Sequence, residues 1–140
     1  MTTVDIADRK SRLRALGFLS LAALTCTVMI AVRTGRGGDF VQGLWLGLLV
    51  GCAISLLPIK RWLRPNSAVL RLVEDEGTRE NRRISCTIGF WAAVGVALLF
   101  QLTSHFNPTI GAEDVGQVVA TAGIVAAMIS FAVLELRAAR

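Results

Sequence analysis

The chain has 140 residues, of which 54% are hydrophobic and 18% are charged, and its formal net charge is +5. This length leaves room for one domain, and the apolar fraction lies well above that of ordinary soluble proteins. The charged residues gather in a few patches separated by four long uncharged stretches, a pattern that excludes an ordinary soluble fold.

The uncharged stretches are long enough to be transmembrane helices. A helix needs about 20 residues to cross a hydrocarbon core about 30 Å thick. None of the stretches shows a polar face at the helical period. We therefore predict an all-α fold, a polytopic membrane four-helix bundle that forms a single transmembrane domain over residues 1–140. The predicted spans are residues 15–32, 40–59, 84–103 and 115–134.

Basic residues precede the first span, as they do in a secretory signal peptide. However, the apolar stretch is longer than a typical signal sequence, and no Ala-x-Ala cleavage site follows it before Arg33. A lipoprotein signal would have a small residue before its cysteine, whereas Thr25 precedes Cys26. We interpret residues 15–32 as a retained helix.

The second span carries a small residue at every fourth position. This small-residue stripe consists of Gly43, Gly47, Gly51 and Ser55. Such a stripe lets another helix approach closely where lipid provides no hydrophobic drive. Its partner is either a helix of the same chain or a helix of another subunit. We expect the bulky residues off the stripe to face lipid, namely Leu44, Trp45, Leu48 and Leu49.

The third span repeats this spacing with Gly89 and Ala93. A short glycine-rich loop, residues 33–39, joins the first two spans, and residues 104–114 join the last two. Short loops connect antiparallel neighbours. The sequence therefore predicts two antiparallel hairpins connected by a cytoplasmic linker, residues 60–83.

The positions of Lys and Arg predict the orientation in the membrane. Four precede the first span, seven lie in the linker and two follow the last span, whereas the two short loops hold two between them. The positive-inside rule places the richer segments, and with them both chain ends, in the cytoplasm of a bacterial inner membrane. These basic segments can also contact anionic lipid head groups, so no nucleic acid is needed to explain the charge.

The linker contains a charged segment made of Glu74, Asp75, Glu76, Arg79 and Glu80. Charges four residues apart pair along a helix face, which favours a solvated helix. The alternative is a docking surface for a partner or regulator. A divalent-cation site usually needs a defined loop, and we predict no metal here.

Residues 73–80 of the linker resemble the DERTREI-type juxtamembrane motif of small bacterial four-helix membrane proteins of unknown function. The resemblance covers these eight residues and the span layout. The chain departs from the motif at Gly77, where a basic residue is usual, and at Asn81, where an aliphatic one is usual. The resemblance implies the same architecture and carries no activity with it.

Polar residues gather near the predicted outer surface in a layer formed by Gln42, Gln101, Gln117 and His105. One interpretation is a shallow site open to the periplasm. The other is that the amides hydrogen-bond between helices or reach lipid head groups.

We expect no catalytic residue and no cofactor. Ser104, His105 and Asp114 lack the surroundings of a serine nucleophile, and the three cysteines match no metal or redox motif, so we interpret them as buried small apolar residues. Coupled transport generally requires an ionisable side chain in the middle of a span, and none of the predicted spans has one there.

We predict a non-enzymatic protein that acts by helix–helix association, as an accessory or assembly subunit or as a homo-oligomer. The alternative is a small transporter or pore formed by an oligomer.

Overall fold

The computed structural model describes residues 3–35, 38–57, 76–104 and 111–138. These residues form four helices: α1 (Thr3–Arg33), α2 (Gly38–Leu56), α5 (Glu76–Ser104) and α6 (Ala112–Ala138). Each is long and apolar enough to cross a membrane. The predicted all-α class is therefore confirmed, and each predicted span overlaps one of these helices, although α2 ends at Leu56 and residues 58–59 of the second span lie outside the described residues.

Two helices begin well before the spans predicted for them. α1 starts at Thr3 rather than at residue 15, and α5 starts at Glu76 rather than at residue 84. Arg, Glu, Ala and Leu favour helix, and a helix satisfies its own backbone hydrogen bonds in water as well as in lipid. Part of the predicted linker is thus the first two turns of α5, and residues 58–75 lie outside the described residues.

α1 ends in a turn that depends on glycine. The N–H of Thr34 donates to the carbonyl of Ile30 over 3.0 Å, and the N–H of Gly35 donates to the carbonyl of Val32 over 3.1 Å. Gly35 has a φ of +66°, which lies in the left-handed region. Glycine adopts this conformation at little cost because it has no Cβ. This sharp end separates α1 from α2.

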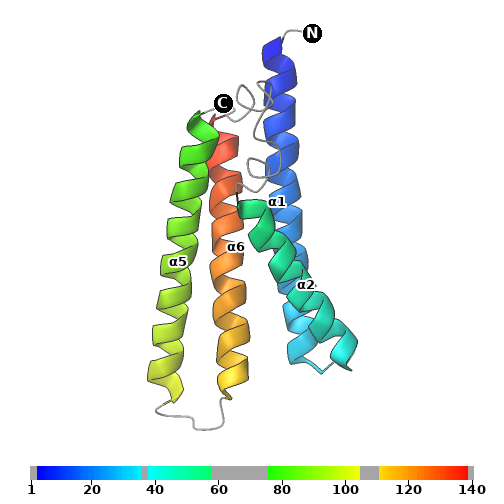
Figure 1. Cartoon of the computed structure of the whole chain (residues 1–140), viewed down its shortest axis with the longest axis vertical. Helices are drawn as coiled ribbons and strands as arrows, with labels where there is room; N and C mark the ends of the chain where they lie inside the picture. The colour runs from blue at the N-terminus through cyan, green and yellow to red at the C-terminus, as the bar shows by residue number, and fades with distance from the viewer. Residues whose placement is uncertain (1–2, 36–37, 58–75, 105–110, 139–140) are drawn as a thin grey trace.

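α6 is the central helix, since it contacts each of the other three. α5 lies along one side of α6, α1 lies along another, and α2 leans across α1 and α6 (Figure 1). The first turn of α1 and the last turn of α6 lie at the same end of the bundle, which we call the terminal end (Figure 1). The opposite end, where α1 ends and α6 begins, is called the turn end.

α5 and α6 approach each other through small residues. A Cβ added at Gly89 would lie 2.5 Å from the carbonyl oxygen of Gly123 and 2.7 Å from the Cβ of Ala127. A Cβ added at Gly123 would lie 3.0 Å from the Cβ of Ala93. Close backbone packing of this kind provides dispersion contacts where lipid removes the hydrophobic drive.

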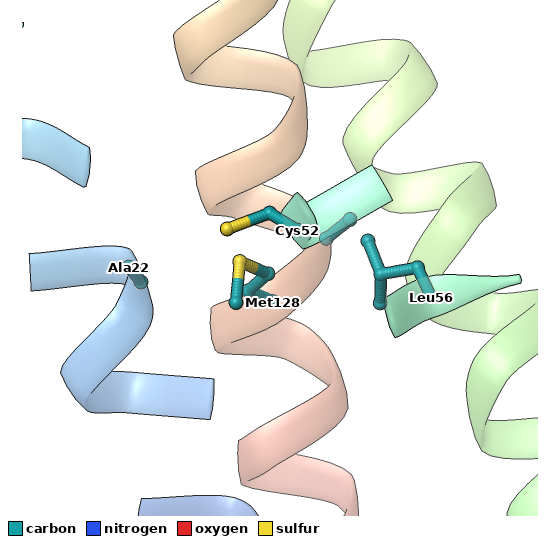
Figure 2. Close-up of a cluster of buried hydrophobic side chains, with 5 residues drawn as sticks. Ala22, Cys52, Leu56 and Met128 are labelled. Carbon is teal, nitrogen blue, oxygen red and sulfur yellow. The ribbon is translucent and has the colours of Figure 1, made fainter. Parts of the chain in front are cut away.

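α1, α2 and α6 share a core in which Cys52 and Met128 are buried beside Ala22 (Figure 2). Leu56 and Ala127 complete this cluster, and Phe18 meets Phe131 edge-on nearby. The three cysteines differ in exposure: Cys52 is buried, Cys26 is half-buried and Cys86 is exposed. The interpretation of all three as buried residues is therefore wrong for Cys86, which lies on an outer face of α5.

Trp45 and Leu49 point into the bundle, where they pack with Val28 and Met29. The prediction that they face lipid is wrong, although Leu44 is exposed as expected. A buried indole N–H needs an acceptor, and that of Trp45 donates to the hydroxyl oxygen of Thr121 over 3.0 Å. The bulky side of α2 therefore covers α1 and α6, and the small side faces outward.

Candidate functional site

The small-residue stripe of α2 lies on the outer surface of the chain. Its members Gly43, Gly47, Gly51 and Ser55 are all exposed. A Cβ added at any of the three glycines would meet nothing within 4 Å beyond its own helix. Gly89 and Ala93, by contrast, pack against α6 within the chain. Among the described residues, no helix covers the face of α2 that is best suited to close backbone approach.

Two side-chain contacts connect α1 and α2 to the start of α6 at the turn end. The amide nitrogen of Gln42 donates to Oε1 of Glu113 over 3.0 Å. Nη1 of Arg33 lies 3.3 Å from Oδ1 of Asp114. Both acids stand in the first turn of α6, where negative charge offsets the positive end of the helix dipole. Gln42 therefore has an interhelical partner.

The other members of the predicted polar layer are spread over α5 and α6. Gln101 is exposed near the end of α5, and Gln117 is half-buried on α6, where its backbone carbonyl accepts the hydroxyl of Thr121 over 2.8 Å. His105 lies outside the described residues. Within the described ranges, no group of three or more His, Cys, Asp or Glu side chains is placed to hold a metal ion.

The predicted charged segment is described only in part. Glu74 and Asp75 lie outside the described residues, and Glu76 begins α5. Arg79 and Glu80 are exposed in the first turns of that helix. These two side chains are therefore accessible at the terminal end of the bundle.

A buried carboxylate that the sequence analysis missed lies between α1 and α6 at the terminal end. Glu135 is only 5% exposed. Its Oε2 accepts a hydrogen bond from Ser11 over 2.8 Å, and Nη1 of Arg14 lies 3.9 Å from its Oε1. Oε1 itself is buried, and no group in the described part of the chain forms a hydrogen bond with it. This carboxylate therefore joins α1 to α6.

The burial of Glu135 was not predicted, because this residue directly follows the last predicted span and its position is typical of a solvated tail. The helical period contains the missing signal. Glu135 follows Phe131 by four residues and Met128 by seven, and both of these are buried. It therefore belongs to the inward face of α6, where an acid needs a partner from another helix.

An apolar groove runs between α1 and α6 toward the turn end. Cys26, Met29 and Ile30 line it from α1, and Val118, Ala122 and Val125 line it from α6. Its volume is about 350 Å³. Arg33 and Thr34 lie at its turn end, next to the ion pair with Asp114.

Comparison of the chain with known protein families, with curated proteins and with solved structures finds no match. The geometry described above gives three candidate sites: the small-residue stripe of α2, the buried carboxylate of Glu135 and the groove between α1 and α6.

Proposed function

We propose that the chain is a multi-pass protein of a bacterial inner membrane, with both ends and the linker in the cytoplasm. The four apolar helices support a membrane location. The concentration of Lys and Arg in the first part of α1, in the predicted linker and after the last predicted span supports this orientation, with two hairpins. The same basic residues are suited to anionic lipid head groups on the cytoplasmic side.

Two ion pairs between α1 and α6 support this placement. Arg14 pairs with Glu135 at the terminal end, and Arg33 pairs with Asp114 at the turn end. Arg14 and Arg33 are separated by 19 positions, or about 29 Å at the α-helical rise. A bilayer's hydrocarbon core is about 30 Å thick. The two pairs are therefore spaced to lie at its two boundaries, with only uncharged residues of α1 between them.

Within the membrane, we propose that the protein acts without catalysis, by helix–helix association, as an accessory or assembly subunit or as a homo-oligomer. The observation that carries this proposal is the uncovered small-residue stripe of α2. Small residues permit the close backbone contacts on which helix association in lipid depends. α5 and α6 use such contacts within the chain, whereas none of the other three described helices covers the stripe of α2.

The test is the double substitution Gly47→Leu and Gly51→Leu. Because a Cβ at either position meets nothing nearby, the leucines leave the single chain intact and obstruct only an approaching helix. The matched control is Gly17→Leu together with Gly95→Leu, since both of these glycines are also exposed and open. We expect the α2 variant to lose association in mild detergent and the control to retain it. Equal association in both would refute the proposal.

The buried carboxylate favours a second candidate function, a small transporter or pore formed by an oligomer. Coupled transporters commonly hold an ionisable residue in a membrane-spanning helix. Glu135 is buried near the end of the apolar helix Ala112–Ala138, at the cytoplasmic boundary that the placement above gives it. The test is proton-coupled flux in liposomes with Glu135→Gln. Flux that requires Glu135 supports this candidate, and absence of flux in the unaltered protein rules against it.

A further inference from the structure

The groove between α1 and α6 has the form of a site for one long apolar chain. On α1 its lining residues recur at helical spacing from Cys26 through Met29 and Ile30 to Arg33, so the groove follows the helix axis. On α6 the small side chain of Ala122, between Val118 and Val125, leaves the hollow open. The groove is lined by apolar groups along its whole length, and Arg33 and Thr34 contribute their carbon atoms at its turn end.

The charged groups next to the groove's turn end match a particular kind of head group. The side chains of Arg33 and Asp114 form a pair at 3.3 Å and remain 39% and 46% exposed, so both keep free hydrogen-bonding capacity. Asp39 and Glu113 are also exposed at this end. By sequence, the two short loops and the helix ends that they join carry three acids, Asp39, Glu113 and Asp114, against two arginines, Arg33 and Arg36, which disfavours a head group with net negative charge.

We propose that the groove binds a zwitterionic phospholipid with a primary amine, of the phosphatidylethanolamine class. One acyl chain lies between α1 and α6, the phosphoryl group accepts hydrogen bonds from Arg33, and the ammonium group donates to Asp114. This inference rests on the membrane placement proposed above, because that placement puts the turn end at the level of the head groups. It does not depend on association through α2.

Trp45 provides a built-in reporter for the acyl chain. Its indole donates to Thr121, and Thr121 is itself part of the groove lining. The chain has three tryptophans, so Trp62→Phe with Trp91→Phe leaves Trp45 as the only indole. Bromine atoms on the acyl chain of phosphatidylethanolamine quench an indole that lies close to them, and Trp45 lies one hydrogen bond away from the groove lining. We expect the fluorescence of Trp45 to be quenched in liposomes of this brominated lipid.

The matched variants are Ala122→Leu, which fills the groove, and Ala120→Leu, which adds the same side chain at an exposed position of α6. We expect Ala122→Leu to lose most of the quenching and Ala120→Leu to retain it. A brominated lipid with an anionic glycerol head group should bind the groove about threefold more weakly than brominated phosphatidylethanolamine, as expected for one exposed charge pair. Arg33→Gln with Asp114→Asn should remove that preference.

Equal quenching in the Ala122→Leu and Ala120→Leu variants would overturn the inference. Quenching that falls as the protein-to-lipid ratio rises would also overturn it, because the groove would then hold a second copy of the chain. A stronger effect of the anionic lipid would contradict the proposed head group. If the protein does not enter liposomes, the membrane placement fails as well. Loss of association in the Gly47→Leu, Gly51→Leu variant with unchanged quenching would leave the lipid site standing.

Discussion

At the scale of single residues, the two ion pairs between α1 and α6 differ in their surroundings. The side chain of Glu135 is 6% exposed and that of Arg14 is 34% exposed, whereas both partners of the Arg33–Asp114 pair are substantially exposed. Removing one partner of a buried pair leaves an uncompensated charge, while exposed pairs contribute little. Removing Arg14 should therefore lower the free energy of unfolding more than removing Arg33 or Asp114.

We predict that Arg14→Ala lowers the free energy of unfolding by about 3 kcal/mol, because it leaves the Glu135 carboxylate buried without its cation. Glu135→Leu should cost less than about 1 kcal/mol, since Arg14 can extend its head group into the aqueous boundary. The control Asp114→Asn should also change the free energy of unfolding by less than about 1 kcal/mol. Denaturant unfolding in detergent measures all three. A larger loss for Glu135→Leu than for Arg14→Ala would contradict this assignment.

At the scale of helices, glycines of similar sequence context have different roles. Gly89 lies against Gly123 and Ala127, whereas Gly95 on the same helix has open space around it. We predict that Gly89→Ala destabilises the α5–α6 pair by about 1–3 kcal/mol through overpacking. Gly95→Ala should be neutral or slightly stabilising because alanine favours helix. Thermal unfolding in detergent compares them, and equal midpoints would show that α5 and α6 do not pack as described.

The spacing of small residues could be predicted from the sequence, but their neighbours could not. A repeat of four places Gly43, Gly47 and Gly51 on one face of a helix. It does not say which helix covers that face, because this depends on how the whole bundle closes. The inward position of Trp45 was missed for the same reason: its acceptor, Thr121, lies 76 residues away in the chain.

At the scale of the whole molecule, four helices were predictable because lipid imposes a strong constraint. A segment that crosses a bilayer must satisfy its backbone hydrogen bonds internally, so a long uncharged run predicts a helix. The central position of α6 was not predictable, since all four helices are apolar and any of them could fill the middle. The partners of Glu135 follow from that central position, because it brings Ser11 and Arg14 of α1 against α6.

The most direct test of the account is a labelling experiment on four single cysteines in a chain without Cys26, Cys52 and Cys86. Exposed positions are available at both ends of the bundle: Arg9→Cys and Ala138→Cys at the terminal end, and Thr34→Cys and Ala112→Cys at the turn end. A membrane-impermeant maleimide added to spheroplasts should label Thr34→Cys and Ala112→Cys, and should reach Arg9→Cys and Ala138→Cys only after lysis. Labelling of all four before lysis, or of Arg9→Cys and Ala138→Cys from different sides, would contradict the four-span topology.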